Sequence, residues 1–249
     1  LLHAVAVVKA GVFTVIKIIV YLFGLETLNG SDGSIILAIV AGATLLISSV
    51  IALRKDNLKA RLAYSTISQL SYIVLGAAMA TGVGIIASGM HIVMHATAKI
   101  TLFFCAGAIL VASHKTEISQ LDGIGRRMPI TMICFLIGSL GIIGIPPAGG
   151  ALSKWYLMMG TAESGYLIFM FVWMASSLLS SAYLLPIILR AFFRAPEIKP
   201  SNRMQISGGE VKEAPLLCLL GICTASFLTI GAFFIADDLA ALLSPLANM

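Results

Sequence analysis

Ionisable side chains lie inside apolar runs that are long enough to span a membrane, and we expect the chemistry of the chain at these side chains. Lys9 lies in one such run, and the same placement recurs at His91, His95, Lys99 and Lys154. An ionised lysine at the centre of a spanning helix costs roughly 2.5 to 3.5 kcal/mol on insertion scales. A chain with several such groups is therefore expected to use them to move charge. The alternative for each one is a side chain whose stem carries its charge to the membrane surface.

The spacing of His91, His95 and Lys99 predicts that they share one face of a helix. They are four residues apart, so in a helix they form a stripe that covers about 12 Å of depth. Histidine changes its protonation state in the physiological pH range, and a row of such groups linked by water passes protons by short hops. A single histidine would be interpreted as a packing residue. Three titratable groups in register favour a proton path instead.

Metal binding is the alternative use of two histidines at this spacing, and the neighbouring residues argue against it. The zincin helix also carries a catalytic glutamate and gains a third ligand elsewhere, whereas Ile92 occupies the glutamate position here. Two histidines stacked on one helix face cannot bind the opposite faces of one haem iron. We expect neither a metal nor a cofactor in this chain.

Lys154 follows an interruption of a long apolar stretch. The residues that interrupt it include Pro146, Pro147, Gly149 and Gly150. Unwound backbone at membrane depth is tolerated only where it faces protein or a watery cavity, and transporters place ion sites at such broken helices. The alternative is an ordinary surface loop, with the lysine reaching the interface.

Three basic residues occur near the start of the chain. Lys9 lies too deep in its run to reach the surface easily, if the helix begins upstream of Leu1. Lys17 comes eight residues later, and the sequence leaves it open between a place in the path and an anchor at the interface. His3 is a candidate for the entrance of the path.

The elements that must position these residues are transmembrane helices. The chain is 59% hydrophobic and 11% charged, with a mean hydropathy of +1.02, which predicts an all-α integral membrane protein. About seven transmembrane helices fit, one of them broken near Pro146 to Gly150. The apolar runs fall near residues 1–23, 35–53, 62–81, 85–112, 130–161, 165–195 and 215–246.

Basic residues in the loops predict the orientation of these helices. In this threading twelve of the sixteen basic residues fall on one side and none on the other, which places the basic side in the cytoplasm. The twelve are Arg54, Lys55, Lys59, Arg61, Lys115, Arg126, Arg127, Arg190, Arg194, Lys199, Arg203 and Lys212. The four remaining lysines lie within spans that contain no Asp or Glu, so any carboxylate partner is expected from another chain. The net charge of +5 is thus explained by topology and does not indicate nucleic-acid binding.

Four stretches in this order resemble the antiporter-like membrane subunits shared by Mrp-type cation/proton antiporters and proton-pumping NADH:quinone oxidoreductases. The stretches are Lys59–Gln69, His91–Lys99, Leu121–Pro129, and Gly144–Pro147 together with Ser153–Trp155. The resemblance covers roughly residues 1–195. Two of the stretches, Arg126–Pro129 within the third and Ser153–Trp155, incline toward the antiporter group.

The resemblance implies inverted repeats, each with a broken helix, around an axis of buried lysines, histidines and a glutamate. By position, Lys9 resembles the lysine of the central axis, the stripe from His91 to Lys99 its connection, and Lys154 the charged residue of the second broken helix. Lys17 falls where the family is expected to have arginine. The chain resembles the second inverted repeat with one flanking helix on each side. Since it opens without an initiator methionine, we expect the first repeat in a longer chain or in a companion chain.

The resemblance also implies a division of the chain and a function. Residues 1–195 would form the C-terminal part of the antiporter-like domain, 196–214 a cytoplasmic loop, and 215–249 the final transmembrane helix and C-terminus. The function expected is a proton-translocating membrane subunit of a multisubunit Na+/H+ antiporter. The alternative is a proton-pumping membrane subunit of an NADH:quinone oxidoreductase or a related hydrogenase complex, without redox chemistry of its own, so the sequence leaves open whether it serves an enzyme. A structural scaffold is the third class.

The same reading predicts the surroundings of the chain. Its partners would be other membrane subunits, protons, Na+ and the lipid bilayer, with no nucleic acid. Its location would be the inner (plasma) membrane, which it would cross several times. The four cysteines lack a metal-type spacing and are expected to serve as packing residues.

Overall fold

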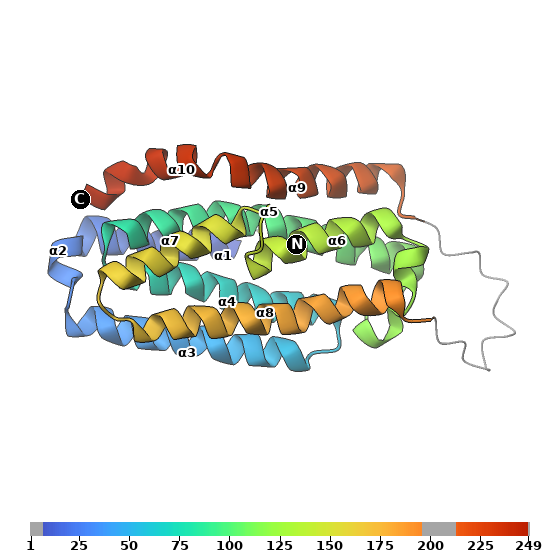
Figure 1. Ribbon diagram of the computed structural model, residues 1–249, viewed down its shortest axis with the longest axis horizontal. Helices are drawn as coiled ribbons and strands as arrows, with labels where there is room; N and C mark the ends of the chain where they lie inside the picture. Colours follow the sequence, from blue (N-terminus) through green and yellow to red (C-terminus); the bar gives the residue numbers. More distant parts are fainter. Residues whose placement is uncertain (1–6, 196–212, 249) are drawn as a thin grey trace, which may run out of the picture.

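The computed structural model describes residues 7–195 and 213–248 and is all-α over that part of the chain. Long helices run side by side along one axis of an elongated molecule (Figure 1). The α-helices are α1 Val8–Lys17, α2 Leu25–Leu28, α3 Asp32–Arg54, α4 Leu58–Ala78, α5 Gly82–Ser113, α6 Pro129–Ile143, α7 Gly150–Glu163, α8 Ile168–Phe193, α9 Leu216–Phe234 and α10 Ala236–Leu243. A π-helix, Ile18–Phe23, continues α1, and short 3-10 helices cover Ile118–Gln120, Ile124–Arg126 and Ser244–Asn248.

Polar caps fix where three of the long helices begin. Ser31, Asn57 and Thr81 each accept a hydrogen bond from a backbone N–H in the first turn of α3, α4 and α5. Such caps satisfy donors that have no partner inside the helix. The loops between α3, α4 and α5 are short, so these three helices alternate in direction.

Four described helices are long and apolar enough to cross a membrane, namely α3, α5, α8 and α9. The other predicted spans are also helical over their described residues, but α4 is rich in hydroxyl groups, α1 continues as a π-helix, and α6 and α7 are two halves of one stretch. The all-α membrane fold and the break near Pro146 to Gly150 are confirmed. The number of membrane crossings stays a prediction.

The last predicted run is divided in two. We expected residues 215–246 to form one helix, but α9 ends at Phe234 and α10 begins at Ala236. Asp237 and Asp238 lie in the first turn of α10, where carboxylates stabilise the positive end of a helix dipole. The predicted cytoplasmic loop lies outside the described residues except for Glu213 and Ala214, so the predicted division into segments stays a prediction.

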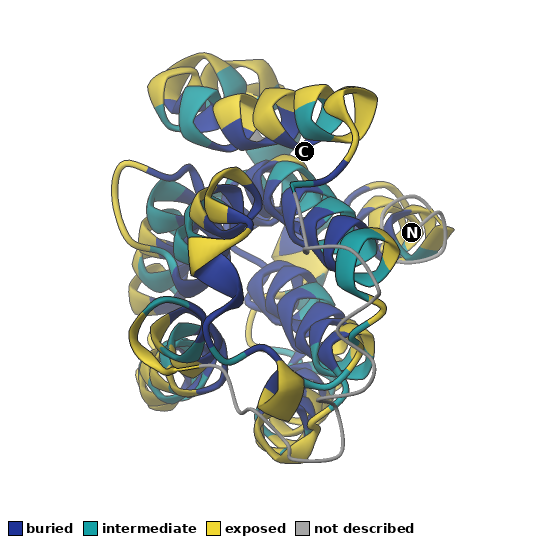
Figure 2. Ribbon diagram, turned by 90° about the vertical axis from the view of Figure 1, so that its right-hand side faces the viewer, coloured by how far each residue is buried: buried dark blue, intermediate teal, exposed yellow. Residues whose placement is uncertain are grey.

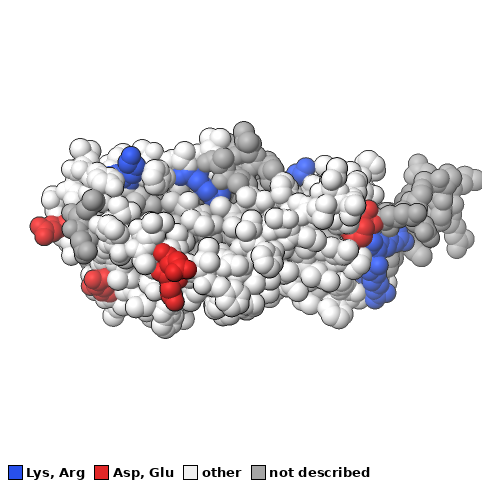
Figure 3. All heavy atoms as spheres, turned by 90° about the horizontal axis from the view of Figure 1, so that it is seen from above, with Lys and Arg blue, Asp and Glu red and all other residues white. Residues whose placement is uncertain are grey.

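Charged residues separate toward the two ends of the molecule. Figure 3 shows a group of Lys and Arg at one end of the face it draws, further Lys or Arg side chains spaced along that face, and most Asp and Glu nearer the other end. Hydrogen bonds join the loops at the basic end: Asp56 accepts from Ser119, and Glu213 accepts from the N–H of Ile130 at the start of α6. The predicted orientation of the helices stays a prediction.

One ion pair in that region has a defined electrostatic consequence. Arg190 donates from Nε to Oδ1 of Asp122 at 2.8 Å, and Arg194 lies 3.9 Å from the other carboxylate oxygen. The hydrogen bond from Arg190 lowers the pKa of Asp122 below its ordinary value. The ion pair thus fastens the loop before α6 to the end of α8.

α4 and α5 form the interior of the bundle. α5 packs against α1, α4, α6, α7, α9 and α10, while α4 packs against α1, α3, α5, α7 and α8. The end-on view in Figure 2 shows buried residues on the inward faces of the helices and exposed ones around the outside. The hydroxyl-rich α4 therefore lies inside the protein, and its polar side chains face other helices.

Candidate functional site

The predicted stripe on α5 lies in the interior. His91, His95 and Lys99 are 1%, 2% and 0% exposed. The two imidazole rings are parallel to within 8°, with centroids 6.1 Å apart, as expected for residues one turn apart on a helix. The three groups therefore form one lane inside the bundle.

His91 joins α5 to two other helices. Its Nδ1 lies 2.9 Å from Oγ of Ser153 on α7, and its Nε2 lies 3.2 Å from Oε1 of Gln69 on α4. An amide oxygen only accepts, so with the amide oriented this way Nε2 carries a hydrogen. The protonation state of His91 then depends on whether Nδ1 accepts from Ser153 or donates to it.

Ser153 has two ways to orient its hydroxyl. Its Oγ lies 2.9 Å from Nδ1 of His91 and 3.2 Å from the carbonyl oxygen of Gly150. A neutral His91 can accept the hydroxyl proton, whereas a protonated His91 donates to Ser153, which can then turn its own proton toward Gly150. This pair of arrangements lets the site hold His91 in either protonation state.

Buried polar atoms lie close to this lane without a protein partner. Among the described residues, neither ring nitrogen of His95 has a hydrogen-bond partner, and the same holds for Nε2 of Gln69. A buried polar atom without a partner costs about 1 to 3 kcal/mol. These atoms therefore mark the part of the lane where water molecules are needed to complete the hydrogen bonding.

Lys99 is surrounded by neutral acceptors. Its ammonium nitrogen donates to Oγ of Ser65 at 2.7 Å and to the carbonyl oxygen of Leu62 at 3.1 Å. Within the described part of the chain no carboxylate lies within 4.0 Å of Lys99 or Lys154. Partial charges alone stabilise each ammonium group, which makes proton loss easier than it would be in an ion pair.

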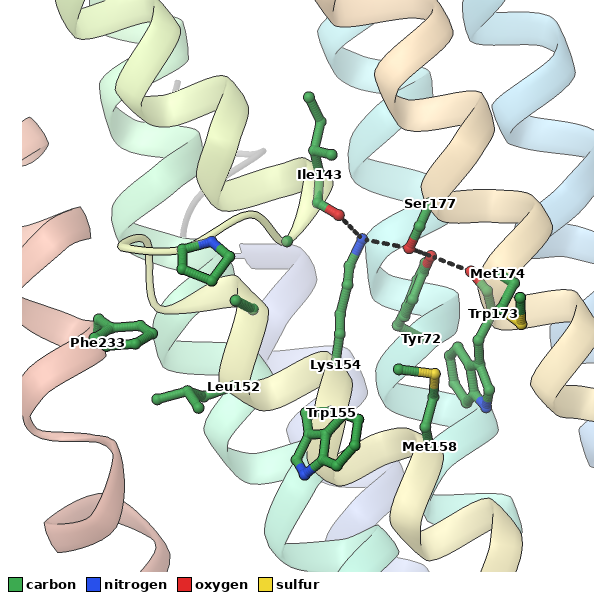
Figure 4. A pocket seen from close by; sticks show the side chains of 13 residues that line it. Tyr72, Ile143, Leu152, Lys154, Trp155, Met158, Trp173, Met174, Ser177 and Phe233 are labelled. Atoms are coloured by element: carbon green, nitrogen blue, oxygen red, sulfur yellow. Dashed lines mark hydrogen bonds between the residues drawn. The ribbon is translucent and has the colours of Figure 1, made fainter.

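The broken helix supplies the partners of Lys154. Its Nζ donates to the carbonyl oxygens of Ile142 and Ile143 at 2.8 and 3.0 Å and to Oγ of Ser177 at 3.2 Å, and Figure 4 shows this nitrogen pointing from α7 toward the end of α6. The last carbonyls of a helix have no partner within it and form the negative end of its dipole. Since Lys154 is 6% exposed, the alternative of a lysine that reaches the surface does not describe it.

Two glycines make room for this geometry. Gly144 ends α6 with φ +90°, and a Cβ there would lie 2.8 Å from Cδ of Lys154. A Cβ on Gly150 would collide with the carbonyl oxygen of Gly141. The first glycine therefore leaves space for the lysine stem, and the second lets α7 begin close against α6.

Tyr72 lies between the α5 lane and Lys154. Its ring stacks on His91 at a centroid distance of 5.4 Å, and Nζ of Lys154 lies 4.7 Å from its ring centroid. Its hydroxyl group bonds Ser177 and the carbonyl oxygen of Trp173, each at 3.3 Å. Tyr72 thus connects the histidines with the broken helix, as the labelled side chains of Figure 4 illustrate in part.

A cavity of about 460 Å³ borders Lys154. Its walls include Tyr72, Ser177, Trp173 and the exposed Trp155, seen together in Figure 4. The cavity is large enough to hold water molecules and reaches the surface of the chain at Trp155.

The structure separates the candidates at the start of the chain. Lys9 is 7% exposed on α1, which packs against α4 and α5. Lys17 is exposed, with its ammonium nitrogen 5.9 Å from the ring centroid of Phe13. His3 lies outside the described residues. The geometry thus groups Lys9 with the interior and leaves Lys17 at the outer surface.

Sequence reasoning missed several residues of the site. It named Gln69 and Ser153 only as ends of the stretches Lys59–Gln69 and Ser153–Trp155, and it did not single out Tyr72 or Ser177. The signal for Gln69 and Tyr72 was their place in an unusually polar membrane helix. Ser177 carries no such signal, because serine is common in membrane helices.

Comparisons with known proteins identify the family of the chain and match its fold. The family model described as NADH:quinone oxidoreductase/Mrp antiporter, TM, matches residues 1–180. NADH-quinone oxidoreductase subunit N of Desulforudis audaxviator is 36% identical over 159 residues, and subunit L of Rickettsia conorii is 37% identical over 193 residues. The fold of a chain in the structure of the Mrp complex from Dietzia sp. superimposes with a TM-score of 0.84 at 20% identity.

The chain corresponds to a part of each of these proteins. The matches cover 64% and 77% of this chain but 32% and 28% of the two oxidoreductase subunits. The structural match covers 96% of this chain and 50% of the chain from the Mrp complex.

Proposed function

The chain belongs to the NADH:quinone oxidoreductase/Mrp antiporter transmembrane family, and we propose that it is a proton-translocating membrane subunit of a multisubunit Na+/H+ antiporter. One observation carries the proposal: His91, His95 and Lys99 form a buried stripe on α5, and the Tyr72 ring connects its His91 end with Lys154 at the broken helix. Buried ionisable groups inside a membrane protein are costly, so a whole row of them supports a role in moving charge.

Protons pass between Lys99 and Lys154 along α5. Water bridges the polar atoms of His95 and Gln69, and His91 accepts or releases a proton at Nδ1 opposite Ser153. Water then carries the proton past the Tyr72 ring, which stacks on His91, to the Tyr72 and Ser177 hydroxyl groups beside Lys154. Each lysine holds its proton through neutral hydroxyl and carbonyl groups. Repulsion between positive charges in the lane makes protonation of one site favour proton release from the next.

Lys9 extends the lane at its α1 side. Its burial against α4 and α5 supports this place. Lys17 serves as an anchor at the surface, since it is exposed. His3 remains a candidate for the entrance.

A second candidate function is the proton-pumping membrane subunit of an NADH:quinone oxidoreductase. The curated relatives favour it, because they are subunits N and L of NADH-quinone oxidoreductases at 36% and 37% identity. In that case redox chemistry resides in other subunits and this chain supplies only the proton lane. In either case the chain works beside other membrane subunits in the inner (plasma) membrane.

The test uses membrane vesicles that contain the intact complex with wild-type chain, Lys99→Ala or Lys17→Ala. Internal pH is followed after addition of Na+ and, separately, after addition of NADH. We expect the internal pH to change in the wild type and in Lys17→Ala. In Lys99→Ala we expect no change of internal pH, although the amount of assembled complex is the same. A response to Na+ supports the antiporter, and a response to NADH alone supports the oxidoreductase. An unchanged response in Lys99→Ala would falsify proton transfer through this lane.

A further inference from the structure

We propose that hydroxyl groups on α4 and α8 form a second proton route between Lys99 and Lys154, parallel to the histidine lane on α5. The inference rests on the proposed function and adds Ser65, Tyr183 and Ser180 to the residues that carry protons. Tyr183 and Ser180 were not singled out in the sequence.

The first half of the route is a chain of direct hydrogen bonds. Nζ of Lys99 donates to Oγ of Ser65 at 2.7 Å, the phenol of Tyr183 donates to the same oxygen at 3.0 Å, and Oγ of Ser180 lies 3.1 Å from that phenol oxygen. Ser65, Tyr183, Ser180 and Lys99 are all 0% exposed. The chain therefore leads from the lysine on α5, across α4, to the inner face of α8 without contact with lipid.

The second half follows α8 toward the broken helix. Ser180 and Ser177 are three residues apart on α8, so their Cβ atoms are about 5 to 6 Å apart, a separation that one bridging water molecule spans. Oγ of Ser177 lies 3.2 Å from Nζ of Lys154. Figure 4 shows Ser177 facing Lys154 across the border of the cavity, which supplies the water.

Further hydroxyl groups lie beside this step. Oγ of Ser176 is 3.4 Å from Oγ of both Ser49 and Ser68, and the last two are 2.8 Å apart. All three are buried. This cluster makes the contact between α3, α4 and α8 polar. Because Ser176 lies one turn from Ser180 on α8, the cluster also provides polar groups near the Ser180 hydroxyl.

Transfer along the route conserves protons and requires no redox partner. Before a transfer, the Tyr183 hydroxyl turns from Ser65 toward Ser180, and the Ser65 hydroxyl turns toward the phenol oxygen. Lys99 then passes a proton to Oγ of Ser65 while the Ser65 hydroxyl passes its own proton to Tyr183, and the same exchange continues through Ser180, water and Ser177 to Lys154. The ammonium of Lys99 becomes an amine, and the amine of Lys154 becomes an ammonium. The hydroxyl groups then rotate back before the next transfer.

The two routes differ in their chemistry. The α5 lane uses histidines that can hold a proton, whereas the α8 route uses hydroxyl groups that only relay one. Because both begin at Lys99 and end at Lys154, loss of one leaves the other. This arrangement predicts how variants of the two routes combine.

The experiment measures proton exchange in vesicles with the intact complex carrying His95→Ala, Tyr183→Phe or both, normalised to assembled complex. Each single variant is expected to lose part of the rate, and the double variant to fall to the rate of Lys99→Ala, a loss greater than the product of the single losses. Tyr64→Phe is the matched control, because that phenol lies on α4 near Lys55, outside the route, and it is expected to keep the wild-type rate.

Other outcomes overturn the inference or the proposed function separately. If the two losses multiply, or if Tyr183→Phe has no effect in either background, Tyr183 only packs and the hydroxyl route is wrong while the histidine lane stands. If Lys99→Ala itself keeps its rate, the proposed function is wrong. If Tyr183→Phe prevents assembly, Ser180→Ala replaces it, because it interrupts the same route with a smaller change of side chain. The double variant of Ser180→Ala with His95→Ala must then fall to the exchange rate of Lys99→Ala.

Discussion

Lys154 donates a 2.8 Å hydrogen bond to the carbonyl oxygen of Ile142, which lies twelve residues earlier in the chain on the other side of the helix break. The carbonyl acceptor of Lys154 is therefore available only because the helix is broken at this point. An unbroken helix would satisfy this carbonyl through its own backbone, and the lysine would have no acceptor at this depth. The end of α6 therefore determines where the ammonium group of Lys154 lies.

Gly144→Ala tests this dependence. The added methyl group lies against the stem of Lys154, and the alanine must keep the positive φ of this position. We therefore expect slower proton exchange and a loss of about 1 to 2 kcal/mol of stability from the backbone. Gly165→Ala is the control, because Gly165 has φ +78° and open space around the added Cβ. It should lose similar stability but keep its exchange rate. Equal rates in the two variants would contradict the role of Gly144, and thermal unfolding of the purified complex measures the stability.

Ser153→Ala removes the hydroxyl that lies against Nδ1 of His91. We expect slower exchange and a loss of about 1 to 3 kcal/mol of stability, because Nδ1 of the buried His91 is left without a partner. Ser139→Ala serves as the comparison, since the Ser139 hydroxyl is also buried but has no hydrogen-bond partner among the described residues. That variant should be neutral in both measurements. Loss of exchange in Ser139→Ala but not in Ser153→Ala would reverse the assignment.

His95→Phe should separate stability from function. Neither nitrogen of His95 has a partner within the described ranges, so an apolar ring removes two costly buried atoms and is expected to leave stability equal or higher. Exchange should nevertheless fall, because the middle of the lane is lost. His91→Phe is expected to lower both the stability and the exchange rate, since His91 bonds Ser153 and Gln69. A destabilised His95→Phe with normal exchange would disprove this reading.

The Asp122–Arg190 pair predicts a dependence on pH. The pKa of Asp122 is depressed in the folded state by Arg190, so its contribution to stability is present above the ordinary Asp value of about 3.9 and is lost as the pH falls through the lower folded value. Relative to Asp122→Asn, the wild type should be more stable at neutral pH by less than about 1 kcal/mol, and the difference should vanish in acid. Arg194→Ala, which removes the 3.9 Å contact, should show a smaller effect. A difference that grows in acid would refute the sign.

Periodicity and composition were sufficient to predict the α5 stripe and the break before Lys154. Both are local features: a spacing of four residues defines a helix face, and prolines with glycines interrupt a helix. The partners of these groups were not predictable, because Ile142 contributes a backbone carbonyl and Ser177 a common side chain from a distant helix. Their role follows only from tertiary packing.

Lys17 shows the limit of depth arguments. It lies eight residues after Lys9, which on a helix corresponds to a rotation of about 80° beyond two full turns. That rotation places Lys9 against α4 and α5 and leaves Lys17 exposed. The orientation of α1 depends on apolar contacts such as Val12 and Ile16 with Ile73, and the spacing of two lysines alone could not reveal it.

The most direct test of the account is the rate of proton exchange in vesicles that contain the intact complex with Lys154→Ala. Proton exchange is expected to be lost while the complex assembles in normal amounts. Without Lys154, no group beyond Tyr72 can hold the proton. Exchange at the wild-type rate in fully assembled Lys154→Ala would contradict it.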